Sequence, residues 1–269
     1  MEFCSPIRQA TGGSTVEHMA VIDLNADLGE TVGGVPTADD EAMFAVISSA
    51  SVACGGHAGD AASMRDAVAR AGRHGVAVGA HPSYPDTANF GRLAVVLDPA
   101  DLALIVARQL ADLVASGADL RYVKPHGALY HAVTRDRGQA DAVARAVADR
   151  AALLGRPLPV LGLSGEIARA AASVGLPFVH EAFLDRGYLP DGSLVPRARP
   201  GALLDDPELV AVRAVRLARE AVVEAIDGSV IAAEAASLCV HGDSPAAVDM
   251  ARAVRAALDA AGVEVRAPW

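Results

Sequence analysis

Lys124 is the only lysine in the chain, and every other member of its 23 lysines and arginines is an arginine. A lysine amine can shift its pKa, transfer a proton or act as a compact point charge, whereas arginine is effectively never deprotonated. His126 lies two positions later and shares a strand face with Lys124 if the extended conformation continues past Pro125. An amine beside an imidazole at the end of a strand predicts a chemical role for Lys124.

Further acidic, histidine and arginine side chains are gathered in short runs, and each run directly follows an apolar segment. In the first run, Asp23, Asn25 and Asp27 alternate along the chain and so point to one face of a strand. The candidate functional residues in these runs are Asn25, Asp27, His57, His81, Arg92, Lys124, His126, Tyr130, Glu181, Asp185, Arg186, Arg197, His241 and Asp243.

The types of these side chains indicate anion binding together with proton transfer. Arg92 is a candidate clamp for a carboxylate or a phosphate, and His57 can act as a base or a ligand. The segment 181–197 holds carboxylates and guanidiniums that can bind an anionic substrate and also supply a general acid or base. A purely structural role inside a barrel competes with function for Asp23 and Asn25.

A divalent metal site is a further option. His57, His81, His126 and His241 can assemble one in three dimensions with nearby aspartates. No two of these histidines have the spacing of a local metal-binding motif, so the sequence leaves the metal undetermined. The motifs G-x-x-x-x-G-K-[ST], G-x-S-x-G and H-E-x-x-H are absent from the sequence, so a bound nucleotide would need a different phosphate cradle.

The polar runs are positioned by a repeated unit of an apolar strand, a glycine-rich polar turn and an amphipathic helix. The predicted strands are 21–25, 46–53, 76–80, 122–125, 159–163, 178–182 and 237–240. The predicted helices are 38–46, 61–74, 99–116, 139–154, 164–174, 207–225 and 245–261. This α/β alternation, with about seven parallel strands, favours a closed or nearly closed (β/α) barrel whose active-site loops follow the strands.

The sequence predicts one barrel domain, residues 20–269, behind a disordered leader, residues 1–19. The net charge of −10 argues against binding to nucleic acid. No apolar run approaches the roughly 20 residues of a membrane span, so we expect no membrane insertion. The 3 cysteines lack CxxC spacing, which argues against a disulfide framework and favours a reducing, cytoplasmic location.

Taken together and in order, the polar runs resemble the LamB/YcsF family, which comprises the A subunits of prokaryotic ATP-dependent 5-oxoprolinases. The matching stretches are IDLNADLGE (22–30), ACGGHAGD (53–60), GAHPSYPD (79–86), VKPHGALY (123–130), FLDRGY (183–188) with DGSLVPR (191–197), and VHGD (240–243). One departure is Gly56, where members of the family carry Phe. This change removes an aromatic wall beside His57 and predicts a looser pocket.

The resemblance implies a single distorted (β/α) barrel of the glycoside hydrolase/deacetylase type and the ATP-dependent cleavage of 5-oxo-L-proline to L-glutamate. It also implies partner subunits B and C, with ATP as a cofactor bound by an undetermined subunit, and it leaves a homo-oligomer open. The implied catalytic residues are Asp27, His57, Lys124, His126, Asp185, His241 and Asp243. The implied substrate-binding residues are Asn25, His81, Arg92, Tyr130, Glu181, Arg186 and Arg197.

Within that reaction we expect Lys124 to neutralise charge on a phosphorylated lactam oxygen. His241 with Asp243 is a second route for proton transfer. The residues expected to clamp anions are Arg92, Arg186 and Arg197. The residues expected to serve as the base are His57, His126 or Asp27.

Three other functions are compatible with the sequence. A stand-alone metal-dependent deacetylase or amidohydrolase would bind a divalent ion through His57, His81, His241 and Asp27. A non-catalytic subunit would bind a small acid for its partners, because the missing P-loop leaves direct contact with ATP open. A lyase would form a Schiff base on Lys124.

Overall fold

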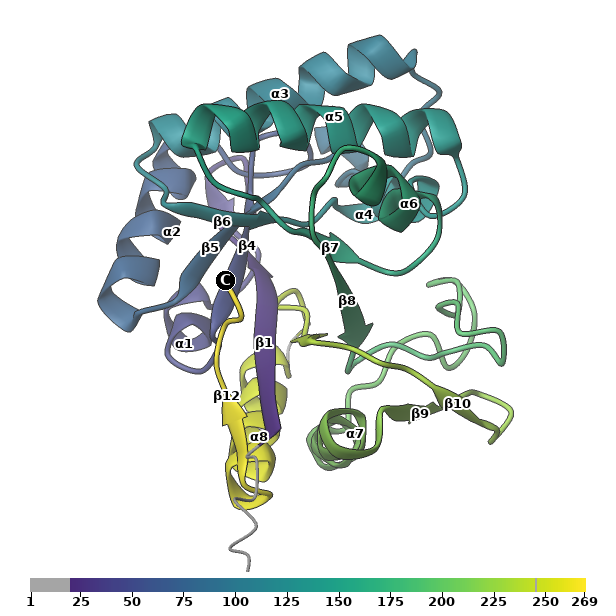
Figure 1. Cartoon of the computed structure of the whole chain (residues 1–269). Coiled ribbons are helices and arrows are strands. Elements are labelled where there is room, and N and C mark those ends of the chain that lie inside the picture. Colours follow the sequence, from purple (N-terminus) through teal and green to yellow (C-terminus); the bar gives the residue numbers. More distant parts are fainter. Residues whose placement is uncertain (1–19, 245) are drawn as a thin grey trace, which may run out of the picture.

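The structure is a computed structural model that describes residues 20–244 and 246–269, and its centre is a closed barrel of parallel strands. Around the barrel the order is β1, β4, β5, β6, β7, β8 and β11, and β11 pairs back with β1 (Figure 1). The bounds are β1 Ala20–Leu28, β4 Ser49–Ala53, β5 Ala77–His81, β6 Leu120–Val123, β7 Val160–Gly162, β8 Phe178–Phe183 and β11 Ser237–Cys239. The predicted barrel is confirmed, and each of these strands overlaps a predicted one.

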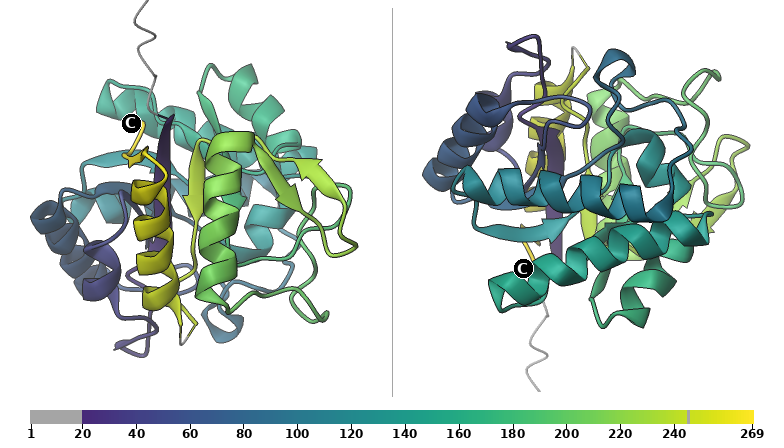
Figure 2. Two further views of the ribbon diagram at one scale, coloured as in Figure 1. Left: turned by 90° about the horizontal axis from the view of Figure 1, so that it is seen from below. Right: turned by 90° about the horizontal axis from the view of Figure 1, so that it is seen from above.

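Helices cover the outside of the barrel. Their bounds are α1 Asp40–Phe44, α2 Ala61–His74, α3 Pro99–Ala115, α4 Gly127–Ala132, α5 Arg137–Leu154, α6 Glu166–Ser173, α7 Pro207–Glu220 and α8 Ala247–Ala260, with the short 3-10 helix η1 Thr87–Asn89. Helices α3 and α5 lie side by side on one flank, and α7 and α8 lie side by side on another (Figure 2). Within the described ranges, no helix combines the length and apolar character that a membrane crossing requires.

Local sequence signals account for the bounds of α2, which match the prediction. The carboxylate of Asp60 accepts hydrogen bonds from the backbone N–H groups of Ala62 and Ser63, and so caps the first turn. The helix ends at Gly75, whose φ of 68° is left-handed and favours glycine. The cap at Asp60 fixes the junction between α2 and the loop that precedes it, which carries His57.

Several elements differ from the prediction. The helix predicted over 207–225 ends at Glu220, because Ala221 is left-handed with φ 52° and the chain then enters β9. Strands β9 (Val222–Glu224) and β10 (Val230–Ala232) form a hairpin beside α7. Helix α4, the hairpin of β2 (Thr31–Val32) with β3 (Val35–Pro36), and β12 (Val263–Val265) have no predicted counterpart. The predicted leader over 1–19 lies outside the described residues.

Polar side chains occupy the interior of the barrel along β1. Asp23 is fully buried and accepts hydrogen bonds from the hydroxyls of Ser48 (2.6 Å), Ser49 (2.7 Å) and Ser237 (2.5 Å). Burial raises the pKa of Asp23 to about 6, and the hydroxyl hydrogen bonds offset only part of that effect. Asp23 therefore links β1 to its two neighbouring strands, in agreement with the structural role considered for it.

We expect Asp23→Asn to stabilise the protein at neutral pH. In the unfolded chain this carboxyl ionises at about pH 4, but in the folded protein it ionises at about pH 6. The carboxyl therefore lowers stability as the pH rises through this window, by about 3 kcal/mol in total. Asparagine does not ionise and removes that loss. Denaturant unfolding below about pH 4 and above about pH 6 tests this expectation. It would be contradicted if the free energies of unfolding of variant and wild type differed by the same amount at both pH values.

Candidate active site

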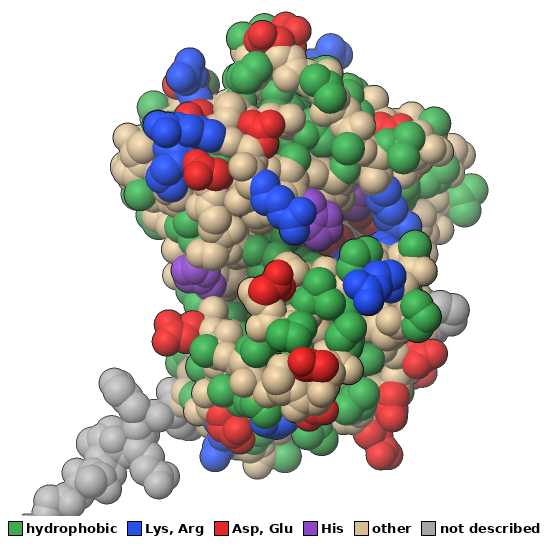
Figure 3. Space-filling view, turned by 90° about the vertical axis from the view of Figure 1, so that its right-hand side faces the viewer, with side chains coloured by type: hydrophobic (Ala, Val, Ile, Leu, Met, Phe, Trp, Pro, Cys, Tyr) green, Lys and Arg blue, Asp and Glu red, His purple; other side chains and the backbone are tan. Residues whose placement is uncertain are grey.

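The C-terminal ends of the barrel strands and the loops that follow them enclose a cavity of about 410 Å³. The predicted residues that line it are Asp27, His81, Arg92, Lys124, His126, Tyr130, Arg186, Arg197, His241 and Asp243. The other predicted residues contact lining residues from behind, and they are Asn25, His57, Glu181 and Asp185. Figure 3 shows a hollow that contains histidine and acidic side chains and is bordered by Lys or Arg side chains.

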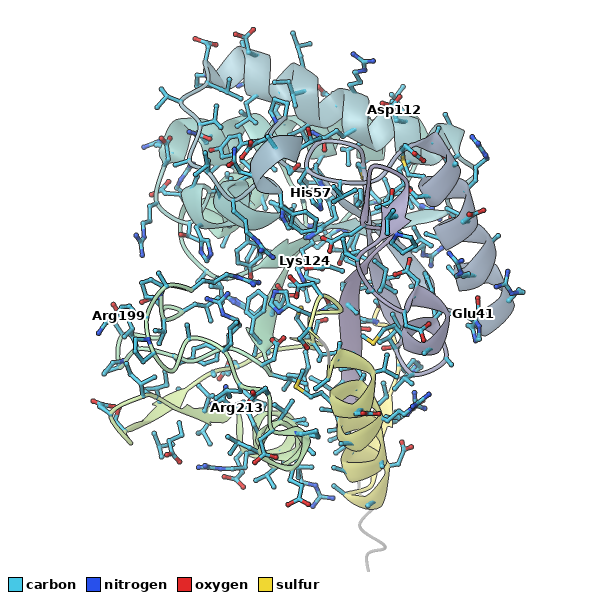
Figure 4. The ribbon with its side chains drawn as sticks, turned by 180° about the vertical axis from the view of Figure 1, so that it is seen from behind. Glu41, His57, Asp112, Lys124, Arg199 and Arg213 are labelled. Atoms are coloured by element: carbon cyan, nitrogen blue, oxygen red, sulfur yellow. The ribbon has the colours of Figure 1, made fainter. Side chains whose placement is uncertain are left out.

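The ammonium group of Lys124 is fully buried at the floor of the cavity. It donates hydrogen bonds to Asn25 Oδ1 at 3.1 Å and to Asp27 Oδ1 at 2.9 Å, and it forms an ion pair with Glu181 Oε1 at 2.9 Å. A third hydrogen bond from the ammonium group goes to Cys239 Sγ at 3.2 Å. An ammonium group has three N–H donors, so these partners engage all of them. Figure 4 places Lys124 in the middle of the barrel.

These contacts fix the charges of Lys124 and Asp27. Burial alone would lower the pKa of Lys124, but Asp27 and Glu181 outweigh it and hold that pKa well above its usual value. Burial alone would raise the pKa of Asp27, but His81 and Lys124 hold it well below its usual value. The geometry argues against direct contact between Lys124 and a phosphorylated oxygen, because no donor is free. It also argues against a Schiff base, because the amine stays protonated.

Glu181 and Asn25 lie behind the cavity wall. Glu181 accepts hydrogen bonds from the hydroxyl of Tyr130 at 2.9 Å and from Asn25 Nδ2 at 3.0 Å. Asn25 also donates to Ser237 Oγ at 2.8 Å. Because their polar atoms are engaged with one another and with Lys124, both residues are placed to position that lysine. This placement does not favour the direct substrate contacts that were expected of them.

Histidines and a glutamate form a second buried group next to Asp27. Candidate metal-binding atoms of Glu30, His57, His81 and His126 all lie within 4.8 Å of one another. Burial holds the pKa values of His57 and His126 well below their usual range, so both rings are neutral at pH 7. Burial and, to a smaller extent, Asp27 raise the pKa of Glu30 to about 7. A group of this composition is able to hold a divalent metal ion.

His241 is paired with Asp185 rather than with Asp243, which corrects the expected pairing. Its Nδ1 lies 2.9 and 3.0 Å from the two carboxylate oxygens of Asp185, and its backbone N–H donates to the same carboxylate. Burial would lower the pKa of His241, but Asp185 outweighs burial and raises it. Because Nδ1 carries the hydrogen, Nε2 is the nitrogen left for the cavity. An imidazole held in this way is suited to proton transfer.

Asp243 lies instead at the rim of the cavity between two arginines. Its Oδ2 is 2.7 Å from Nη2 of Arg92 and 3.9 Å from Nη1 of Arg197. Both guanidiniums are partly exposed and line the cavity, so they are accessible to an anion. The Arg186 guanidinium is buried and donates to two backbone carbonyls of the loop after β8, which fastens that loop over the cavity.

Comparison with known proteins agrees with the resemblance of the polar runs. The model of the LamB/YcsF family matches residues 22–268, which is nearly the whole described chain. The chain belongs to this family. It is 50% identical over 252 residues to the 5-oxoprolinase A subunit of Streptomyces avermitilis, and the match covers 92% of this chain and 99% of the relative.

A second relative and a solved structure agree with this assignment. The chain is 48% identical over 257 residues to the 5-oxoprolinase A subunit of Corynebacterium jeikeium, with coverage of 94% and 98%. The crystal structure of a lactam utilization protein from Thermus thermophilus is 44% identical, has a TM-score of 0.85, and matches over 92% of this chain and 99% of that one.

In this LamB/YcsF protein, Gly56 does not loosen the pocket, contrary to the prediction. A Cβ atom at Gly56 would lie 2.4 Å from Ser83 Oγ and 2.6 Å from Gln109 Oε1, so the space is already filled. The side chain of Gln109 is held there by hydrogen bonds to the backbone N–H and carbonyl of Ser83. The aromatic wall beside His57 is supplied by Phe90, whose ring centroid is 5.2 Å from that of the imidazole.

Glu30 is the residue of this LamB/YcsF site that was not singled out from the sequence. It lies three positions after Asp27, so simple strand alternation would turn it to the opposite face. Strand β1 ends at Leu28, and the left-handed Gly29, with φ 70°, turns Glu30 back into the cavity wall. The glycine after the strand is the one local signal for this change of direction.

We expect Lys124→Met to destabilise the protein because it leaves Asp27 and Glu181 as unpaired buried carboxylates. Removal of one partner of a buried ion pair typically costs about 3–5 kcal/mol in the free energy of unfolding. Adding Glu181→Gln should recover part of the lost free energy of unfolding, since it replaces one of the two unpaired carboxylates by a neutral amide. Denaturant unfolding compares the wild type with both variants, and equal stability of the single and double variants would count against this ion-pair assignment.

Proposed function

We propose that this LamB/YcsF protein is the A subunit of an ATP-dependent 5-oxoprolinase, which cleaves 5-oxo-L-proline to L-glutamate as ATP is hydrolysed to ADP and phosphate. The observation that carries the proposal is that residues from the polar runs shared with the family line one cavity. The chain also matches a 5-oxoprolinase A subunit over 99% of that relative's length. The proposed partners are subunits B and C. Because the sequence lacks a P-loop motif, we assign ATP use to the assembled complex.

The shape and charge of the cavity suit a small acid. Its volume of about 410 Å³ lies within the range of about 300–1,000 Å³ that is usual for small-molecule sites. Arg92 and Arg197 are accessible at its rim and share the single carboxylate of Asp243. Guanidinium groups pair well with carboxylate and phosphate oxygens. These two arginines are therefore our candidates for holding the carboxylate or a phosphoryl group of the reacting lactam.

The chemistry of the reaction defines what the site must supply. A five-membered lactam is a stabilised amide, and phosphorylation of its carbonyl oxygen converts that oxygen into a leaving group. Water then attacks the ring carbon, and the carbon–nitrogen bond breaks as the ring nitrogen takes up a proton. A second water hydrolyses the resulting acyl phosphate and releases phosphate and glutamate. The site must bind anions, orient the water and deliver that proton.

Two groups in the cavity meet the last two requirements. His241, held by Asp185 through Nδ1, presents Nε2 as the group that transfers the proton. Asp27 is kept ionised and fixed by Lys124 and lines the cavity, so it can accept a hydrogen bond from the attacking water. In this assignment Lys124 acts on the reaction through Asp27.

Reconstitution tests the proposed function. The chain is combined with subunits B and C, 5-oxoproline and ATP, and glutamate release is measured with each component omitted in turn. We expect glutamate only when the chain, both partners and ATP are present. Glutamate release that is unchanged without this chain would overturn the proposal.

A pair of arginine variants gives this experiment a matched control. Arg197→Gln removes a charged donor from the cavity and should raise KM for 5-oxoproline about 10- to 100-fold. Arg199 lies two positions along the same loop, is exposed, does not line the cavity and sits at the edge of the molecule in Figure 4. Arg199→Gln should leave KM unchanged, and equal effects of the two variants would remove Arg197 from the binding site.

The same experiment separates the rival functions. Amide hydrolysis by the isolated chain with a divalent metal and without ATP would favour the stand-alone amidohydrolase, for which the Glu30 and histidine group is the supporting observation. Glutamate release that requires this chain and is impaired by Arg197→Gln, yet is unchanged by substitution of His241, would favour a small-acid-binding subunit.

Asp185→Asn should change the pH dependence of turnover in a defined direction. The Asp185 carboxylate raises the pKa of His241, so its removal lowers that pKa. If protonated His241 donates to the ring nitrogen, the fall in kcat at high pH should move to lower pH in the variant. Asp191→Asn, a change at an exposed loop residue that does not line the cavity, is the control. A profile unshifted by Asp185→Asn would remove His241 from proton transfer.

A further inference from the structure

Backbone carbonyls fix the tautomers of two buried histidines. Nδ1 of His81 lies 2.7 Å from the carbonyl oxygen of Lys124, and Nε2 of His126 lies 2.9 Å from the carbonyl oxygen of Phe90. A carbonyl oxygen only accepts hydrogen bonds, so each of these nitrogens must carry a hydrogen. In neutral rings the other two nitrogens, Nε2 of His81 and Nδ1 of His126, then present lone pairs.

Those two lone pairs face each other. Nε2 of His81 and Nδ1 of His126 are 2.9 Å apart. Asp27 Oδ2 lies 3.2 Å from the His81 nitrogen, and Glu30 Oε1 lies 3.8 Å from the His126 nitrogen. When both rings are neutral, four acceptor atoms converge with no hydrogen between the two rings, and either a proton on His81 or a bound cation relieves that arrangement. A buried cluster of this kind is unfavourable unless a positive charge lies among its atoms.

The spacing and ring orientations suit a metal ion. Ligand bonds of about 2.0–2.1 Å place neighbouring ligand atoms of a tetrahedral site roughly 3.3 Å apart, close to the separations of 2.9, 3.2 and 3.8 Å found here. The rings of His81 and His126 are inclined at 84°, so one point can lie in both ring planes. The two backbone carbonyls act as the outer-shell acceptors that typically orient metal-binding histidines.

His57 belongs to the surroundings of this site rather than to its ligands. Its ring is stacked on that of His126 at 3.6 Å with an interplanar angle of 7°, so one ion cannot lie in both ring planes. Its Nε2 contacts Glu30 Oε1 at 3.0 Å, and it does not line the cavity. This contact orients the carboxylate of Glu30, so His57 supports the site through Glu30 and not as a ligand.

We propose that His81, His126, Glu30 and Asp27 bind one divalent transition-metal cation at the floor of the cavity. Two imidazole nitrogens with carboxylate oxygens suit zinc, iron, cobalt or nickel better than magnesium or calcium. All four residues line the cavity, which provides a path of entry. Such a cation supplies a Lewis acid beside the proposed substrate site. The inference goes beyond the proposed function, because it rests only on the geometry of these four side chains.

Metal titration of the full chain without substrate or partners tests the proposal. The chain is stripped with a chelator and titrated with Co²⁺, whose visible absorption reports nitrogen and oxygen coordination, and Zn²⁺ is then added to displace it. We expect one equivalent to bind. His57→Gln should weaken binding about 10- to 100-fold, as outer-shell changes do, and His81→Gln and His126→Gln should weaken it further.

Controls keep the result interpretable. His180→Gln makes the same change at an exposed histidine on β8 outside the cavity and should leave binding unchanged. Circular dichroism checks folding, and Glu30→Gln provides a milder ligand change if a histidine variant unfolds. The proposal would be overturned if the chain bound less than one equivalent of metal, or if all variants bound it equally tightly. It would also be overturned if the metal-exposed protein held a proton between the imidazoles of His81 and His126. None of these three results affects the reconstitution test of the 5-oxoprolinase function.

Discussion

The buried ammonium group of Lys124 is the constraint on which the rest of the site depends. It carries a permanent charge in the middle of the barrel and is neutralised by Asp27 and Glu181, with Asn25 as a further acceptor. An unpaired charge in such a place would cost several kcal/mol. The end of β6 is therefore joined to β1 and β8 across the barrel interior by interactions that tolerate little displacement.

Lys124 also organises the histidine group through its backbone. Its carbonyl oxygen accepts the hydrogen bond from His81 Nδ1, while its side chain holds the carboxylate of Asp27, which contacts the other nitrogen of the same ring. One residue thus sets the tautomer of His81 and the charge beside it. His126 is positioned in turn by His81 and by the loop that contains Phe90. The cavity has an acidic and imidazole-rich floor and an arginine-bearing rim.

The predicted barrel is confirmed, and the residues singled out from the sequence lie in or directly behind one cavity at the ends of its strands. The alternation of apolar strands with amphipathic helices is a local property, and so is the position of polar runs directly after strands. The shared face of Asp23, Asn25 and Asp27 also follows from strand alternation, and all three form hydrogen bonds to side chains from other parts of the barrel. The cap at Asp60 and the stop at Gly75 likewise depend only on neighbouring residues.

Interactions between distant residues were decided by the tertiary structure. His241 pairs with Asp185, 56 positions away, rather than with the nearby Asp243, because β8 and β11 are neighbours in the barrel. Glu30 joins the histidines because the left-handed Gly29 interrupts the alternation of the strand and turns Glu30 toward the cavity. The sequence by itself determined that Lys124 is solitary and follows a strand. Only closure of the barrel decided that its donors are engaged by β1, β8 and β11. Strand register, which is set by packing, brings the partner atoms of these strands together around the amine.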